Sequence, residues 1–145
     1  MARYRTTVRT SSSPEAAFEL IADFRTVADW DPGVSRSTLP DGVEPGVGAT
    51  YSVKAGFVDL EYETLEFAPP RRTVLEAVSS TLRSYDVITF EPLDDGGTDV
   101  TYDATLELRG LFSPLGLGLG LVFDRIGDKA AAGLAKALDG DIVSE

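Results

Sequence analysis

The chain is short and acidic, and it lacks two residue types that carry much of enzyme chemistry. Its 145 residues fit one domain, expected over residues 1–145, that can bury a core and still enclose a cavity. The formal net charge of −11 argues against binding nucleic acid, which needs clustered Lys and Arg. The absence of Cys and His excludes disulfides and removes the usual transition-metal ligands, so we expect no metal and no cofactor.

Two stretches bear on where the protein resides. Residues 1–10 alternate in polarity and lack the apolar core of a signal peptide, which favours a cytoplasmic location. The apolar run from Leu115 to Phe123 is far shorter than the roughly 20 residues that cross a bilayer. We therefore expect no stable insertion into a membrane.

The chain opens with a strand followed by two short helices. Apolar and charged residues alternate over residues 3–9, as in a half-buried strand. Ser13 followed by Pro14 is a typical helix start, with Ser13 as the N-cap. A second helical turn is expected over Arg25–Ala28, and the Asp29–Gly33 segment, which contains the sole tryptophan, Trp30, ends it as a turn.

Six further strands follow, separated by turn-forming Pro, Gly and Asp residues. They are expected over Val34–Leu39, Ala49–Lys54, Val58–Phe67, Thr73–Val78, Leu82–Glu91 and Thr98–Arg109. Short connections between consecutive strands favour antiparallel pairing. With the first strand, the sequence predicts a seven-stranded antiparallel sheet.

A long helix is expected over Ser113–Leu138. Apolar residues recur at steps of three and four on one face, namely Leu119, Val122, Phe123, Ile126, Ala130, Leu134, Ala137 and Leu138. A second stripe has almost no side-chain volume and consists of Gly116, Gly120, Gly127 and Ala131. Beside that stripe, either another part of the chain approaches closely or space is left for a ligand.

This order of elements resembles the helix-grip fold of the START-like or SRPBCC superfamily, which includes polyketide cyclase/dehydrase and lipid-transport proteins. The resemblance covers the whole chain and rests on Ser13–Phe18, Asp23–Phe24, Trp30–Gly33, Phe67–Arg71, Phe90–Pro92 and Gly97–Tyr102. It implies an α+β fold in which a curved sheet wraps a long C-terminal helix and encloses an apolar cavity. None of these motifs is catalytic, so they indicate fold rather than activity.

Three functions remain open under this resemblance. The first is binding of a hydrophobic small molecule, such as a lipid, polyketide or isoprenoid-like compound, in the internal cavity. The second is an enzyme of polyketide cyclase, aromatase or dehydratase type that uses a cavity carboxylate or Tyr. The third is a protein-interaction module like a chaperone activator. The protein is expected as a monomer, or as a homodimer formed through the exposed edge of its first strand.

Strand parity selects the candidate ligand contacts. Tyr102 shares the inward face of the last strand, and Tyr62 shares parity with Val58 and Leu60. Each phenol could orient a ligand or simply pack in the core. Trp30 could line the cavity mouth or serve packing alone. On the long helix, Phe123, Gly116 and Gly120 are the candidate contacts.

Asp86 is the candidate catalytic carboxylate. It would face inward if Ser84, Ile88 and Phe90 form the buried face of its strand, whereas Tyr85 and Val87 offer the opposite parity. An inward carboxyl would favour its neutral form and could act as acid or base. The alternative is a structural ion pair with Arg83 or Arg72.

Overall fold

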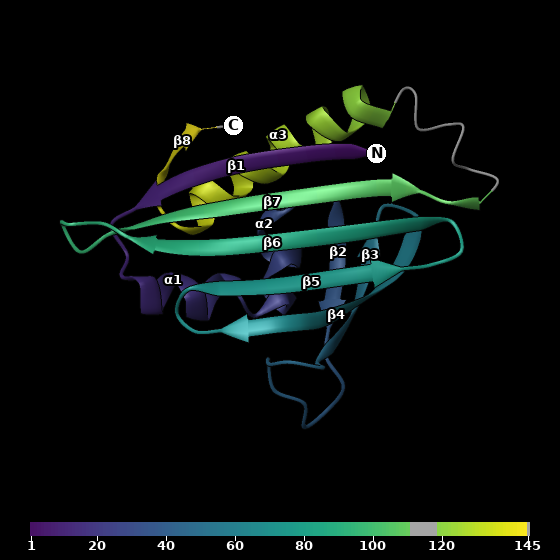
Figure 1. Cartoon of the computed structure of the whole chain (residues 1–145), viewed down its shortest axis with the longest axis horizontal. Helices are drawn as coiled ribbons and strands as arrows, with labels where there is room; N and C mark the ends of the chain where they lie inside the picture. The colour runs from purple at the N-terminus through teal and green to yellow at the C-terminus, as the bar shows by residue number, and fades with distance from the viewer. Residues whose placement is uncertain (111–118, 145) are drawn as a thin grey trace.

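The structure is a computed structural model that describes residues 1–110 and 119–144. Eight antiparallel strands form one curved sheet in the order β2-β3-β4-β5-β6-β7-β1-β8. The long helix α3 lies behind the sheet, as do the short helices (Figure 1). The strands are β1 (Ala2–Thr10), β2 (Val34–Thr38), β3 (Thr50–Ala55), β4 (Val58–Ala68), β5 (Arg72–Val78), β6 (Leu82–Pro92), β7 (Thr98–Leu108) and β8 (Asp141–Ser144).

The predicted α+β helix-grip architecture is confirmed, but the strand count of seven is wrong. Strand β8 pairs antiparallel with β1 at Thr7, Val8 and Arg9. Its four residues are all exposed and show no alternation of polarity, so they carry no periodic sign of a strand. Because β8 covers this part of β1, the first strand does not present a free edge there for a homodimer.

Three helical segments connect β1 to β2. They are α1 (Pro14–Ile21), the 3₁₀ turn η1 (Phe24–Thr26) and α2 (Val27–Trp30). The expected N-cap is confirmed, since Ser13 Oγ accepts a hydrogen bond from Ala16 N at 3.2 Å. Trp30 is the last residue of α2, so the prediction that it lies in a turn after the helix is wrong.

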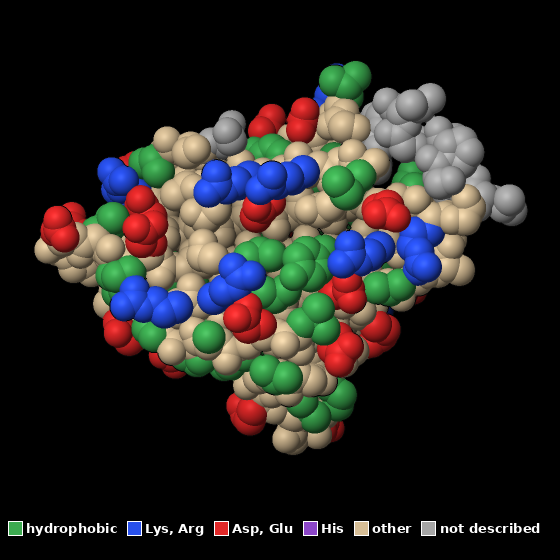
Figure 2. Space-filling model, viewed as in Figure 1, with side chains coloured by type: hydrophobic (Ala, Val, Ile, Leu, Met, Phe, Trp, Pro, Cys, Tyr) green, Lys and Arg blue, Asp and Glu red, His purple; other side chains and the backbone are tan. Residues whose placement is uncertain are grey.

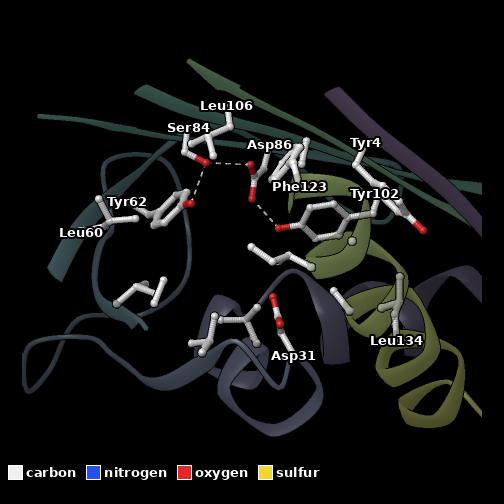
Figure 3. Close-up of a pocket in the computed structure, with 18 of the residues that line it drawn as sticks. Tyr4, Asp31, Leu60, Tyr62, Ser84, Asp86, Tyr102, Leu106, Phe123 and Leu134 are labelled. Carbon is white, nitrogen blue, oxygen red and sulfur yellow. Dashed lines mark hydrogen bonds between the residues drawn. The ribbon is translucent and has the colours of Figure 1, made fainter. Parts of the chain in front are cut away.

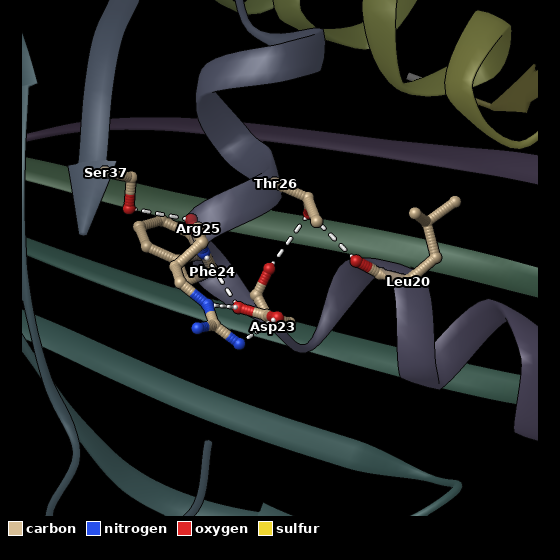
Figure 4. A network of polar contacts seen from close by, with 6 residues as sticks. All are labelled: Leu20, Asp23, Phe24, Arg25, Thr26 and Ser37. Carbon is tan, nitrogen blue, oxygen red and sulfur yellow. Dashed lines mark hydrogen bonds and ion pairs between the residues drawn. The ribbon is translucent and has the colours of Figure 1, made fainter. Parts of the chain in front are cut away.

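Side-chain hydrogen bonds fix the corner around η1 (Figure 4). The Ser37 hydroxyl of β2 donates to the carbonyl oxygen of Phe24 at 2.8 Å. The Thr26 hydroxyl is shared between the carbonyl oxygens of Leu20 and Asp23, at 2.8 and 2.9 Å. These bonds tie η1 to α1 and β2, which holds the buried Phe24 ring against the sheet.

The two ends of the sheet are packed differently. Beneath α1, the Phe18 ring lies edge-on to Phe67 and Phe90, with ring centroids 5.1 Å apart in both pairs. Ile88 and Phe90 of β6 are fully buried at this end. Side chains therefore fill the space between α1 and the sheet. The other half of the sheet faces α2 and α3.

Helix α3 spans Leu119–Ala137 in the described chain, and the predicted part before residue 119 lies outside the described residues. The face predicted to be buried is partly wrong, because Val122 and Ile126 are 56% and 47% exposed and Ala137 is exposed as well. The helix buries the smaller residues Gly127 and Ala131, together with Leu134, Ala135 and Leu138.

Close contacts of α3 with β1 and α2 explain why the helix buries its small residues. A Cβ atom at Gly127 would collide with the ring of Tyr4 on β1, and one at Gly133 would collide with the carbonyl oxygen of Trp30. Both roles left open for the small-residue stripe occur, because Gly127 lies against the Tyr4 ring, and Gly127 and Ala131 also line a pocket. No described helix is long and apolar enough to cross a membrane.

Candidate functional site

A pocket of about 330 Å³ lies between the open half of the sheet and the helices α2 and α3. Its walls come from β1, β2, β3, β4, β6 and β7 on one side and from the helical segments on the other (Figure 3). Most of the lining is apolar, contributed by Phe24, Val27, Trp30, Val34, Val53, Ala55, Val58, Leu60, Leu82, Ala104, Leu106, Phe123, Ile126, Ala130, Ala131 and Leu134.

Strand register places a row of polar side chains across the sheet wall. Ser84 and Asp86 point inward from β6, flanked by Tyr62 of β4 and Tyr102 of β7 (Figure 3). The inward parity of Asp86 is thus the one the structure adopts, and Ser84 and Asp86 are both buried. The sequence analysis predicted Tyr62, Asp86 and Tyr102 as three separate candidates. In the structure they lie together, and Ser84 lies between Tyr62 and Asp86.

Hydrogen bonds join these four residues into a chain. Tyr62 donates to Ser84 Oγ at 2.7 Å, and Ser84 donates to Asp86 Oδ1 at 3.4 Å. From the other side, the Tyr102 hydroxyl donates to Asp86 Oδ2 at 2.5 Å. The carboxyl group of Asp86 is therefore the common acceptor at the centre of the row.

Burial controls the protonation of this row. It raises the pKa of Asp86 to about 7, although the hydrogen bonds from Tyr102 and Ser84 lower it. Burial also raises the pKa of both Tyr62 and Tyr102, so these phenols stay protonated near neutral pH. Asp86 is the group in the row that titrates near neutrality.

The structural ion pairs considered for Asp86 do not form. Arg83 binds Glu76, with 2.6 Å between Nη2 and Oε2, and Arg72 binds Glu66. Both arginines lie on the other face of the sheet because neighbouring residues of a strand alternate. Asp86 consequently has hydroxyl partners and no cationic partner among the described residues.

A second carboxyl group, Asp31, reaches the pocket from the segment that follows α2 (Figure 3). Asp31 Oδ1 accepts a hydrogen bond from Gly33 N at 2.8 Å, and burial raises the pKa of Asp31. The sequence analysis missed this residue, because Asp followed by Pro and Gly is typical of a turn. A turn at a pocket wall and a turn at the surface have the same residue pattern.

Trp30 and the helix candidates differ in their positions. The indole of Trp30 lines the pocket, lies edge-on to Tyr102 at 5.7 Å between centroids, and its Nε1 is buried with no hydrogen-bond partner among the described residues. Phe123 also lines the pocket. Gly120 is exposed and is not a lining residue, and Gly116 lies outside the described residues.

The described residues offer no cluster of three or more Asp and Glu side chains suited to a metal ion. The pocket presents a mostly apolar volume, a row of hydrogen-bonding groups that includes the Asp86 carboxyl, and a second carboxyl from Asp31. Such a site can bury an apolar molecule and orient a polar group on it.

Solved structures of the same fold cover nearly the whole chain. A START superfamily protein from Mycobacterium smegmatis superposes with a TM-score of 0.70 at 15% identity, covering 96% of this chain and 95% of that one. The Zhui aromatase/cyclase from a Streptomyces species gives 0.68 at 15% identity, with 93% and 92% covered. An HSP90 activator from Plasmodium falciparum gives 0.68 at 16% identity, with 98% and 99% covered. At these identities the likeness shows the fold alone.

Sequence comparison gives the family. No curated protein sequence matches the chain. The family model described as polyketide cyclase/dehydrase and lipid transport matches residues 1–139, and this range includes every described pocket residue. The chain belongs to the polyketide cyclase/dehydrase and lipid transport family.

Proposed function

We propose that the protein binds a hydrophobic small molecule in the pocket between the sheet and α3. The observation that carries the proposal is a mostly apolar pocket of about 330 Å³ with a row of hydrogen-bonded polar groups on its sheet wall. Binding pockets for small molecules have this composition and start near this volume. The ligand would therefore be compact, in the range of a short lipid or a small polycyclic compound.

Apolar burial would supply most of the affinity. Each square ångström of apolar surface removed from water contributes roughly 25 cal/mol. The row from Tyr62 to Tyr102 would fix the orientation of the ligand, since it places a line of hydrogen-bonding groups on the sheet wall of a mostly apolar volume. Trp30 would contact the ligand from the helical side.

A second candidate function is catalysis of polyketide cyclase, aromatase or dehydratase type. The specific observation in its favour is Asp86, a buried carboxyl inside the pocket with a pKa of about 7. A group that titrates near the working pH is well suited to general acid–base catalysis. In an enzyme, Asp86→Asn would abolish turnover and leave ligand affinity largely intact, whereas in a carrier it would shift affinity only modestly.

A protein-interaction role has less support. The fold is shared with an HSP90 activator, but such a role needs no internal pocket and would rest on an exposed apolar patch. The lined pocket of this chain favours a small-molecule ligand.

Native mass spectrometry of the freshly purified protein tests the proposal, followed by organic extraction and identification of any bound compound. An apolar compound retained at close to one per chain is expected for a carrier. If the purified protein carries no bound compound and no apolar probe binds to it in solution, the binding proposal fails.

A further inference from the structure

The described lining of the pocket carries negative groups and no positive ones. It includes the carboxyls of Asp31 and Asp86 and no Lys or Arg. Figure 3 shows the two carboxyls on opposite sides of the pocket, that of Asp86 on the sheet and that of Asp31 on the helical side, in the segment that follows α2. An anionic group placed between them would lose water and gain no countercharge.

Arginines on the strands that line the pocket form ion pairs on the outer face of the sheet. Figure 2 shows Lys and Arg side chains beside Asp and Glu on the outer face of the sheet. Arg3 pairs there with Asp103, and Arg83 pairs with Glu76, each at 2.6 Å. The side chain of Arg83 is on the face opposite its neighbour Ser84, so it cannot neutralise a ligand without leaving its strand.

The hydrogen bonds of the polar row also have a direction. The hydroxyl hydrogens of Tyr62, Ser84 and Tyr102 all point along the chain that ends at Asp86. When Asp86 is ionised, the row has lone pairs left over and no free hydrogen. It is then an acceptor surface that calls for a hydrogen-bond donor on the ligand. The buried Nε1–H of Trp30 is a single neutral donor, which does not offset two carboxyls.

We propose that the pocket selects an apolar ligand whose polar end is a hydroxyl, phenol or amine, and rejects ligands that end in a carboxylate or phosphate. This inference rests on the proposed function, since it concerns the ligand of the same pocket. It excludes free fatty acids and intact phospholipids as preferred ligands. It includes alcohols, phenols and amines of similar apolar size.

Three probes with the same alkyl chain test this selection: 1-decanol, decylamine and decanoate. Trp30 is the only tryptophan and lines the pocket, so its fluorescence reports binding directly. At pH 8, the alcohol and the amine should each bind at least about tenfold more tightly than decanoate. Decanoate binding within about threefold of 1-decanol would overturn the inference. If none of the three probes binds, the proposed function itself is contradicted.

A charge-neutral variant separates electrostatics from shape. Asp86→Asn keeps the side-chain size and removes a carboxylate from the pocket, so at pH 8 decanoate should bind about tenfold more tightly and the ratio of the 1-decanol affinity to the decanoate affinity should fall. Glu91→Gln is the matched control, because Glu91 is exposed on the same strand and does not line the pocket. If Asp86→Asn leaves decanoate as weak as in the original chain, charge does not set the selection and the inference is wrong.

Discussion

Tyr102 and Asp86 lie on adjacent strands and on the same face of the sheet, and Tyr102 is two residues away from Ala104, the partner of Asp86. Tyr102 is directly opposite Ile88, so its hydroxyl reaches diagonally to Asp86 Oδ2 at 2.5 Å. Residues two apart on a strand share a face, and such diagonal neighbours are within reach of an aromatic side chain. This pair places a titrating carboxyl and a protonated phenol together in an apolar pocket.

Removing the phenol hydroxyl should change the titration of Asp86. The hydrogen bond from Tyr102 lowers the pKa of Asp86, so Tyr102→Phe should raise that pKa above its value of about 7. The carbon-13 chemical shift of the Asp86 carboxyl, followed against pH, measures it. Tyr85→Phe is the control, because Tyr85 lies on the opposite face of the strand and should leave the titration unchanged. An unchanged or lower pKa in Tyr102→Phe would contradict the hydrogen-bond assignment.

Asp86 should make the protein less stable as the pH rises towards neutrality. Its pKa is about 7 in the folded protein, against an ordinary value of 3.8 for an aspartate in water, so between these values the folded state holds more protons than the unfolded state. The contribution of Asp86 to the free energy of unfolding is therefore greatest below about pH 4, and it falls by roughly 4 kcal/mol between about pH 4 and about pH 7.

Comparison with Asp86→Asn isolates this effect. The groups that act on Asp86 are Tyr102, Ser84, Asp31 and Asp103, and all of them remain in the variant. The stability gained by the variant, measured by urea unfolding at pH 5 and pH 8, should be larger at pH 8. Asp99 and Asp103, whose pKa values are lowered by arginine partners, act at more acidic pH. Burial raises the pKa of Asp31, but Asp31 is present in both proteins, so the comparison reports the difference that Asp86 makes. Equal gains at the two pH values would show that Asp86 does not titrate between them.

Two glycines of α3 should respond oppositely to alanine. At Gly133 a Cβ would collide with the backbone of Trp30, so Gly133→Ala should destabilise the fold by at least about 2 kcal/mol. At Gly120 a Cβ meets nothing within 4 Å, and Gly120→Ala should be neutral or stabilising by up to about 1 kcal/mol. Thermal unfolding of both variants checks this. Equal midpoints would mean that α3 does not approach α2 as closely as the structure has it.

The corner around η1 provides a further matched pair on β2. Ser37→Ala removes the hydrogen bond to the Phe24 carbonyl oxygen and should lower the free energy of unfolding by about 1 kcal/mol. Ser35 is exposed on the same strand, so Ser35→Ala should change stability by less than about 0.5 kcal/mol. Urea unfolding distinguishes the two, and a Ser37→Ala variant as stable as Ser35→Ala would contradict the role of this bond.

The fold was largely predictable because its signals are local. Alternation in the strands and the Ser13–Pro14 helix start each act within a few residues, and the structure confirms them. Strand β8 was missed because its four exposed residues have no pattern of their own and depend on β1 for pairing. The burial of Gly127 in place of Val122 follows from the ring of Tyr4, which lies far away in the sequence.

The site was predictable only in part for a similar reason. Parity placed Tyr62 and Tyr102 on inward faces and left two faces open for Asp86. It could not show that Ser84 links the three residues, because that depends on the register between β4 and β6 across β5. Asp31 had the sequence of an ordinary turn. Its position in the pocket depends on where α2 packs, which no local pattern specifies.

The most direct test of ligand binding is to fill the pocket. Ala130 lines it, whereas Ala132, two residues along the same helix, is exposed and does not line it. A titration of 1-decanol followed by Trp30 fluorescence should show binding weakened at least about tenfold in Ala130→Leu and unchanged in Ala132→Leu. Equal affinity in both variants and the original chain would show that the ligand binds elsewhere and would contradict the assignment of this pocket.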